Sequence, residues 1–407
     1  MIRQPALDNQ LPDVYNPAEW SAYVASRQII SSRQKGHMQT NPFPERLDRF
    51  RTLMSRQELD VFLVAVPENR YYLSGFEAED LLLTESSGYL LVTQTAKYLL
   101  TDSRYEEAAR LEAPDFELAV YSTGLKQLLP ELLSRIKPES LGLEEHFLTV
   151  KRFKEVEEAL AKASPSARIV SSEDLVERLR IVKDEAEIEQ IRKSVRLTEK
   201  ALHTAWNALA PGKSEKEMAW LIEKTIREGG GQAVSFPPIV AAGSNAALPH
   251  AVPTERRIGT GEAVILDLGS KLDGYCSDMT RTWVSGTPEP RLKEIYKIVR
   301  EAQLAAQDKI RAGVDSTEVD SAARDLIGNA GYGDNFGHGL GHGVGLAVHE
   351  KPGLRKVDAT LLEENMIVTV EPGIYLPGFG GVRLENMVRV TGTGCELLTR
   401  EELFYNW

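Results

Sequence analysis

Two pairs of acidic residues, each arranged symmetrically about a turn, constrain how the carboxyl-terminal half of this chain can fold. The first pair, Asp267 and Asp278, flanks the turn-forming segment 271–274, and β-rich runs on both sides predict an antiparallel hairpin. The pair is centred between Leu272 and Asp273. A symmetric hairpin would therefore place the two carboxylates directly opposite each other on one face, with Cβ atoms about 5 Å apart.

The second pair, Glu371 and Glu385, flanks another glycine-rich turn and is centred on Gly378. Like charges that face each other across a sheet destabilise it, so two such pairs require a counter-charge, which a bound cation supplies. A neutral imidazole able to reach them lies in the loop 336–345, whose glycines allow close backbone approach. We assign His342 of this loop, together with the four acids, to a metal site.

The predicted ligand set indicates the number of metal ions and their chemistry. Five ligands are too many for one tetrahedral zinc ion and fit two bridged divalent ions. Because oxygen donors dominate, the set favours Mn²⁺ and also accepts Co²⁺, Zn²⁺ or Fe²⁺. Such a site supports metal-assisted hydrolysis without a nucleophilic side chain. The alternative for each residue alone is a solvated strand face or a turn, and the joint pattern argues against it.

Five motifs occur in the order found in one enzyme family: Asp-Leu-Gly (267–269), Cys-Ser-Asp-Met-Thr-Arg-Thr (276–282), His-Gly-Leu-Gly-His-Gly-Val-Gly (338–345), Val-Glu-Pro-Gly-Ile-Tyr (370–375) and Arg-Leu-Glu-Asn (383–386). They resemble the metallopeptidases of the pita-bread fold, family M24, which include methionine aminopeptidase, aminopeptidase P and prolidase. The resemblance covers most of the chain. It implies that the family's metal ligands correspond to Asp267, Asp278, His342, Glu371 and Glu385.

The same resemblance implies roles for residues around the ligands. In such enzymes the histidine that matches His349 hydrogen-bonds the scissile carbonyl oxygen, and the one that matches His250 lies beside the substrate near the proline ring. Glu371 would be both a metal ligand and the acid/base that carries the water proton to the leaving nitrogen. His338 and Arg383 match positions that bind substrate. The residues alone also allow a loop histidine and a counter-ion for the acids.

The chain is long enough for two domains. Strands and helices alternate through residues 44–178, which predicts an α/β domain without a catalytic constellation. Its segment 69–76 resembles the amino-terminal domain of creatinase, prolidase and aminopeptidase P, which methionine aminopeptidase lacks. Asp184 is a predicted N-cap before an amphipathic helix, and the boundary is placed at 179. We expect an α/β (α+β) fold in which a pita-bread catalytic domain, 179–407, follows this creatinase/prolidase-like domain.

Composition limits the partners and the compartment. A net charge of −12 argues against a nucleic-acid footprint or an anionic membrane surface, and no apolar run has the length of a membrane span. Two cysteines and no secretory signal fit the reducing cytoplasm. Residues 1–43 form an extension of unassigned role, with a helix expected from about Asn16. In relatives the extra domain closes over a neighbouring subunit's site, so we expect a homodimer.

The resemblance also indicates the substrate. A bond before proline lacks an N–H and has a fixed φ, so it requires a dedicated pocket. The amino-terminal domain, the histidines and Arg383 favour a small peptide with proline second. Only fourteen positions separate Glu371 from Glu385, which leaves little room for an insertion and favours prolidase, an Xaa-Pro dipeptidase, over aminopeptidase P, which acts on longer peptides. A non-catalytic pita-bread binding protein, or a metal-free creatinase, would lack ligands that this chain retains.

Overall fold

The computed structural model describes residues 41–405 except 79, 81, 83 and 358. The helix expected from about Asn16 lies outside these residues. Within the described part, no helix is both long enough and apolar enough to cross a membrane. The described chain is mixed α/β, with helices and strands in both its amino-terminal and its carboxyl-terminal parts.

The amino-terminal domain is built on one six-stranded sheet with the order β4-β3-β2-β1-β5-β6. Strand β2 runs antiparallel to both β1 and β3, and the remaining neighbours are parallel. The strands are β1 (Val61–Val64), β2 (Tyr89–Thr93), β3 (Lys97–Asp102), β4 (Glu117–Tyr121), β5 (Ser140–Leu143) and β6 (Arg168–Ser171). The helices are α2 (Phe43–Arg56), α3 (Pro67–Ser74), α4 (Glu106–Glu112), α5 (Leu125–Ile136) and α6 (Val150–Ala163).

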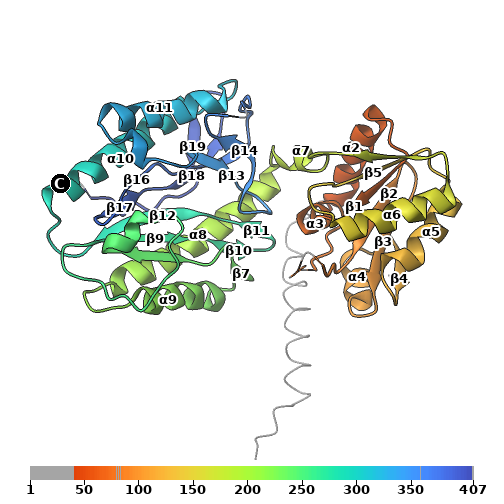
Figure 1. Cartoon of the computed structure of the whole chain (residues 1–407), viewed down its shortest axis with the longest axis horizontal. Helices are drawn as coiled ribbons and strands as arrows, with labels where there is room; N and C mark the ends of the chain where they lie inside the picture. Colours follow the sequence, from red (N-terminus) through yellow and green to blue (C-terminus); the bar gives the residue numbers. More distant parts are fainter. Residues whose placement is uncertain (1–40, 79, 81, 83, 358, 406–407) are drawn as a thin grey trace, which may run out of the picture. The chain divides into compact units, whose positions relative to one another are not determined.

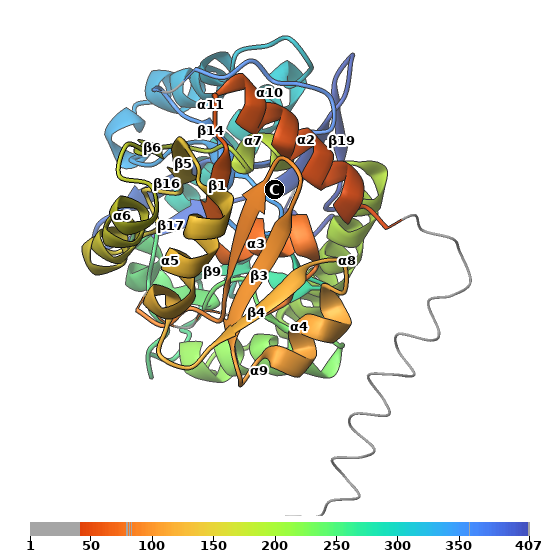
Figure 2. The same cartoon turned by 90° about the vertical axis from the view of Figure 1, so that its right-hand side faces the viewer.

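Alternating side chains of β1 explain why helices cover both faces of this sheet. Phe62 and Val64 pack in one hydrophobic cluster with apolar residues of α2. Val61 and Leu63 point to the other face and pack with residues of α5 and α6. Figure 2 shows these helices on the two sides of the sheet. A continuous apolar run is what a strand buried on both faces requires, because successive side chains point to opposite faces.

The carboxyl-terminal part of the chain follows the short helix α7 (Glu177–Arg180) and includes the long helix α8 (Glu185–Ala208). Its N-cap is Asp184, as the sequence predicts. The Asp184 carboxylate accepts a hydrogen bond from the Glu187 amide at 2.8 Å, and the Glu187 side chain accepts one from the Asp184 amide at 2.9 Å. This capping box satisfies two amides that would otherwise lack partners at the helix start.

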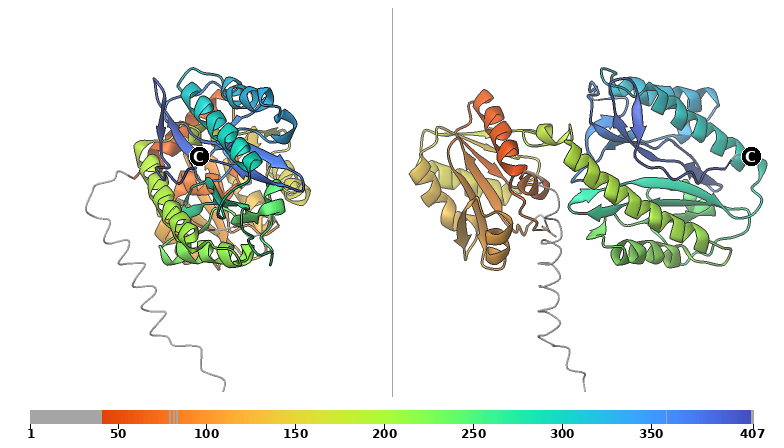
Figure 3. Two further views of the ribbon diagram at one scale, coloured as in Figure 1. Left: turned by 90° about the vertical axis from the view of Figure 1, so that its left-hand side faces the viewer. Right: turned by 180° about the vertical axis from the view of Figure 1, so that it is seen from behind.

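In the carboxyl-terminal part the strands lie between two helix pairs, α8 with α9 and α10 with α11 (Figures 1 and 3). One hydrophobic cluster joins α8 and α9 to β8, β9 and β12, and another joins α10 and α11 to β15 through β18. The helices are α9 (Glu215–Glu228), α10 (Pro290–Lys309) and α11 (Ser316–Asn329), with 3-10 turns η1 (Gly243–Ala247) and η2 (Gly333–Asn335). The strands are β7 (Ala233–Val234), β8 (Ile239–Ala242), β9 (Ala263–Leu268), β10 (Ser270–Leu272), β11 (Tyr275–Cys276), β12 (Met279–Val284), β13 (Gly341–Gly343), β14 (Glu350–Leu354), β15 (Ile367–Val370), β16 (Gly373–Leu376), β17 (Gly380–Arg383), β18 (Asn386–Val390) and β19 (Cys395–Leu397).

The predicted register of the first acidic hairpin is wrong, because the hairpin is centred one position further along the chain than predicted. Asp267 pairs with Thr280, so it is not directly opposite Asp278. The reason is the turn, in which Asp273 and Gly274 both have positive φ, 48° and 81°. This is the Asp-Gly two-residue hairpin turn, whose centre lies between these two residues. Because Asp278 and Thr280 are two positions apart, both aspartates still share one face, as diagonal neighbours.

The predicted register of the second acidic hairpin is confirmed. Gly373 pairs with Arg383 in the β16–β17 ladder, and the β15–β18 ladder continues the same register. Between these ladders the two arms of the hairpin separate. The Glu371 amide donates to Leu340 O at 2.8 Å, and the Glu385 amide donates to Thr280 O on β12 at 3.0 Å. The two glutamates therefore lie where the hairpin passes from one sheet to the next.

The capping box of α8 generates a stability prediction. Asp184→Ala removes the side-chain acceptor, which should cost about 1 kcal/mol and speed amide exchange in the first turn of α8 about five-fold. Asp184→Asn keeps a capping oxygen and is the matched control, with exchange near the wild-type rate. Hydrogen exchange followed by mass spectrometry measures both variants. Equal exchange in the alanine variant and the wild type would show that the cap does not stabilise this turn.

Candidate active site

The structure brings the five predicted ligands together from separate strands. Asp267 lies on β9 and His342 on β13, and the other three lie immediately beside strands. Potential ligand atoms lie within 4.8 Å of one another in three overlapping groups, namely Asp267–Asp278–Glu385, His342–Glu371–Glu385 and Asp278–His342–His349. Shared members join these groups into one cluster of four carboxylates and two imidazoles.

The electrostatics of the cluster fit a bound cation. Among the described residues, Asp267 Oδ1 and Asp278 Oδ1 are buried and have no hydrogen-bond partner. Burial and neighbouring acids raise the pKa of Asp278 and Glu371 well above the usual range, and burial and Asp267 raise the pKa of Glu385 to about 8. Buried acceptors without partners and crowded like charges are both costly. A divalent cation removes both costs, so these residues suit a metal site.

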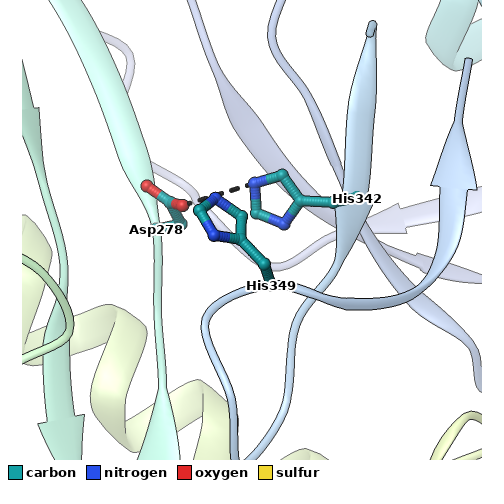
Figure 4. A group of neighbouring side chains, drawn as sticks. All are labelled: Asp278, His342 and His349. Atoms are coloured by element: carbon teal, nitrogen blue, oxygen red, sulfur yellow. Dashed lines mark ion pairs between the residues drawn. The ribbon is translucent and has the colours of Figure 1, made fainter. Parts of the chain in front are cut away.

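His342 presents one ring nitrogen to the carboxylate of Asp278, as Figure 4 shows, and to that of Glu371. Its Nε2 lies 3.6 Å from Asp278 Oδ2 and 3.5 Å from Glu371 Oε1. Its Nδ1 lies 3.1 Å from Gly343 O and donates there, which leaves Nε2 free as a ligand atom. Burial and the neighbouring His349 lower the pKa of His342 to about 4. The imidazole is therefore neutral at physiological pH, as metal binding requires.

Arg383 is the positive charge inside the acid cluster. The guanidinium is buried, and its Nη2 donates to Asp267 Oδ2 at 2.6 Å. Nη1 donates to the Tyr375 hydroxyl at 2.8 Å and to Pro249 O at 3.1 Å, and Nε donates to Thr280 Oγ1 at 3.2 Å. These contacts fit the counter-ion alternative that the residues alone allow. A direct contact of Arg383 with substrate stays a prediction.

His338 is connected to Arg383 through Tyr375, a residue that the sequence analysis missed. His338 Nδ1 donates to Gly339 O at 2.8 Å, so Nε2 accepts from the Tyr375 hydroxyl at 2.9 Å. The same hydroxyl accepts from Arg383. Burial lowers the pKa of His338 to about 4, so this ring is also neutral. The available signal was the position of Tyr375 at the end of the motif that carries Glu371.

Two threonines that the sequence analysis also missed form hydrogen bonds with predicted ligands. Thr280 Oγ1 lies 2.9 Å from Glu385 Oε2 and donates to it, while it accepts from Arg383 Nε. Thr369 Oγ1 accepts from the His342 amide at 3.1 Å. Hydrogen bonds that orient metal ligands are typical of such centres. The available signal was spacing, since each threonine lies two positions from a predicted acidic ligand and thus on the same strand face.

Glu350 follows His349 and forms a buried ion-pair network. Its two oxygens lie 2.6 Å from Arg180 Nη2 and 2.7 Å from Lys183 Nζ. Burial opposes ionisation of Glu350, but Lys183 and Arg180 together lower its pKa below the usual range. These ion pairs connect the start of β14, directly after His349, to Arg180 and Lys183.

All nine predicted site residues line one cavity of about 810 Å³. Apolar residues 236–239 and the loop 249–253 form part of its wall. Ligand sites typically have this size and combine apolar walls with a few converging polar groups. The cavity residues from the sequence analysis are Asp267, Asp278, His342, Glu371, Glu385, His250, His338, His349 and Arg383. Their roles in metal binding and catalysis stay predictions.

Comparisons with known proteins cover both parts of the chain. The family model described as Metallopeptidase family M24 matches residues 189–392, and the Creatinase/Prolidase N-terminal domain model matches residues 46–182. The Xaa-Pro dipeptidase of Pyrococcus furiosus is 37% identical over 360 residues, which cover 88% of this chain and 98% of that protein. Its similarity therefore extends over nearly its whole length.

Solved structures of Xaa-Pro peptidases are also similar to this chain over most of its length. An Xaa-Pro dipeptidase from Bacillus anthracis superposes with a TM-score of 0.82 at 37% identity, over 88% of this chain and 97% of that chain. An X-Pro aminopeptidase from Thermotoga maritima superposes with a TM-score of 0.76 at 36% identity, over 85% and 97%. The predicted order, a creatinase/prolidase-like domain before a metallopeptidase domain, is confirmed. This chain belongs to metallopeptidase family M24.

Proposed function

We propose that this chain is a dinuclear-metal Xaa-Pro dipeptidase, a prolidase. The observation that carries the proposal is the cluster of four carboxylates and His342 at the wall of a peptide-sized cavity, with Asp267, Asp278 and Glu385 buried. The similarity to Xaa-Pro dipeptidases over most of the chain supports the choice of substrate. A binding protein derived from this fold would have no need to retain every member of such a costly cluster.

The metal ligands in this proposal are Asp267, Asp278, His342, Glu371 and Glu385. Two divalent ions at this site would supply the activation of water and the polarisation of the scissile carbonyl. We propose Mn²⁺ because oxygen donors outnumber nitrogen donors and no thiol takes part. In this ligand set each carboxylate and the imidazole comes from a different chain segment, so the fold fixes the spacing of the residues that would hold the ions.

Glu371 is proposed as the acid/base. Its partly buried carboxyl lies beside the other proposed ligands, where it can accept a proton from the attacking water and deliver it to the departing nitrogen. The nitrogen of proline leaves as a secondary amine, so the proton is required for the bond to break. The β15–β16 junction positions the side chain at the point where the hairpin opens.

His349 and His250 are proposed to hold the substrate. Burial and His250 lower the pKa of His349, so its ring is a neutral donor that can hydrogen-bond the scissile carbonyl oxygen. One donor of this kind contributes about 3–4 kcal/mol to lowering the barrier. His250 lies in the apolar loop 249–253 of the cavity wall, which suits the proline ring. His338 and Arg383 complete the proposed substrate pocket on its polar side.

Four further features belong to the proposal. The domain boundaries are 1–43, 44–178 and 179–407.

The protein is a homodimer in which the amino-terminal domain closes over the partner's site. It acts in the cytoplasm, and its described cysteines, Cys276 and Cys395, are free thiols as that compartment favours. It acts on small peptides with proline second and has no nucleic-acid or membrane partner.

A length series tests the proposed substrate. The Mn²⁺-loaded protein should hydrolyse Ala-Pro with a kcat/KM at least about ten-fold above that for Ala-Pro-Ala, which corresponds to about 1.4 kcal/mol of discrimination. Ala-Ala is the control without proline and should remain intact. Equal or greater activity on the tripeptide would select aminopeptidase P, and bound metal without any hydrolysis would select a binding protein.

A titration of the metal-free protein tests the ligand assignment. The wild type should bind two equivalents of Mn²⁺ by isothermal titration calorimetry. Asp278→Asn removes one charged ligand at nearly constant volume and should abolish at least one equivalent. Asp273→Asn is the matched control, because Asp273 lies in the turn of the same hairpin, is exposed and does not line the cavity. Two equivalents in Asp278→Asn would refute the assignment.

The raised pKa of Glu385 predicts how stability depends on pH without metal. This carboxyl holds a proton in the native state up to about pH 8, but in the unfolded chain it loses the proton near pH 4.5. The native state therefore binds more protons between these values, and its contribution lowers the free energy of unfolding as pH rises, by roughly 1.4 kcal/mol per pH unit at most. Glu385→Gln lacks this contribution.

Thermal unfolding of the metal-free protein at pH 5, 6, 7 and 8 measures this effect. The midpoint should decline with pH more steeply in the wild type than in Glu385→Gln. Mn²⁺ should reverse the wild-type trend, because metal binding requires deprotonated ligands. Parallel pH profiles of the two metal-free proteins would contradict the assignment of a buried, proton-binding carboxyl.

A further inference from the structure

We propose that Glu215 is a positioning residue for His250, an inference that rests on the proposed function. Glu215 is the first residue of α9, and its side chain is fully buried. It does not line the cavity. Its carboxylate instead holds the loop 243–253, which carries His250 into the cavity wall.

The Glu215 carboxylate accepts hydrogen bonds from residues at both ends of this loop. At the entry, Glu215 Oε1 accepts from the Ala242 amide at 2.8 Å and from Asn245 Nδ2 at 3.0 Å. At the exit, Oε2 accepts from the Thr254 amide at 2.9 Å and from Thr254 Oγ1 at 2.6 Å. Oε2 also lies 3.1 Å from Asn245 Nδ2. Hydrogen bonds to an ionised acceptor are about twice as strong as those between neutral groups. The bonds to Glu215 therefore hold the two ends of the loop together firmly.

The contacts of Glu215 point to the loop and not to the helix that carries it. The start of α9 is already capped, because the Ser214 hydroxyl accepts from the Glu217 amide at 3.1 Å and the Glu217 carboxylate accepts from the Ser214 amide at 2.7 Å. Every side-chain hydrogen bond given above for Glu215 goes to residues 242–254. The negative charge also lies at a helix N-terminus, which stabilises it there.

The middle of the loop is fixed by Arg383. Its Nη1 donates to Pro249 O, the carbonyl immediately before His250, while its Nη2 pairs with Asp267. His250 itself is exposed, and its apolar neighbours Leu248 and Val252 are 57% and 79% exposed. Packing of these three side chains therefore contributes little to the loop's position. The anchors at the base and at Pro249, together with the buried side chains of Ala246 and Ala251, determine where the imidazole lies.

The test compares Glu215→Gln with Glu144→Gln in the metal-loaded enzyme. Glutamine at 215 places an amide group against the donors of Thr254 or Ala242, so the closure is broken. Glu144 is the control, because it is also buried and accepts from two backbone amides, Ala65 and Val66, but its hydrogen bonds hold the end of β1 and not the loop 243–253. We expect kcat/KM for Ala-Pro to fall about ten-fold in Glu215→Gln and less than two-fold in Glu144→Gln.

A double-mutant cycle separates positioning of His250 from a general structural role. In a His250→Ala background, Glu215→Gln should lower kcat/KM by less than two-fold, because the group that it positions is absent. A full ten-fold loss in that background would overturn the proposal. Thr254→Val removes one donor and is the milder variant if Glu215→Gln folds poorly. It should give a smaller loss with the same disappearance in the His250→Ala background.

Hydrogen exchange distinguishes failure of this proposal from failure of the proposed function. In the metal-free protein, the amides of Ala242 and Thr254 should exchange at least about five-fold faster in Glu215→Gln and at the wild-type rate in Glu144→Gln. This measurement requires no activity. Unchanged exchange would overturn the positioning role whatever the enzyme hydrolyses, whereas faster exchange in a protein without Xaa-Pro activity would sustain the anchor and reject the proposed function.

Discussion

The repulsion among buried carboxylates is the interaction on which the rest of this structure depends. Asp267, Asp278, Glu371 and Glu385 meet in one cluster, and within it Arg383 supplies positive charge through its contact with Asp267. Burial and mutual repulsion drive the pKa of three of these acids upward, so the cluster is costly without a further cation. A fold that retains such a cost points to a bound ion and to the chemistry that the ion supports.

The carboxylates of Glu371 and Glu385 lie where the ladder of paired strands is interrupted. The second acidic hairpin separates at Glu371 and Glu385, whose amides donate to Leu340 O, immediately before β13, and to Thr280 O on β12. Helix pairs pack on either side of the strands and keep their ends in place (Figure 1). The neutral ring of His342 then completes the set from the glycine-rich loop. Metal binding, acid/base action by Glu371 and substrate contact by His349 are thus proposed for one wall of one cavity.

Local sequence patterns predict part of this arrangement. The clustering of the four acids, the Asp184 cap and the register of the second hairpin follow from spacing around a turn or a helix start. The first register was mispredicted because the Asp-Gly turn, with positive φ at Asp273 and Gly274, fixes its own centre. A one-residue shift of the centre changes which residues face each other, although it leaves both aspartates on one face.

Contacts between distant segments could not be predicted from spacing. Arg383 reaches Pro249 across 134 positions, and Tyr375 links His338 to the same guanidinium. Glu215 gave no sequence signal beyond its place at a helix start, yet it closes the loop of His250. Such pairings depend on tertiary packing, so they require the folded coordinates.

The presence of two metal ions in the carboxylate cluster is tested most directly by anomalous X-ray diffraction from crystals of the Mn²⁺-loaded protein. The account predicts two anomalous peaks about 3.5–4 Å apart, with oxygen or nitrogen atoms of Asp267, Asp278, His342, Glu371 and Glu385 about 2.0–2.3 Å from them. A crystal with saturating Mn²⁺ but with no peak among these residues, or with peaks only elsewhere, would contradict it.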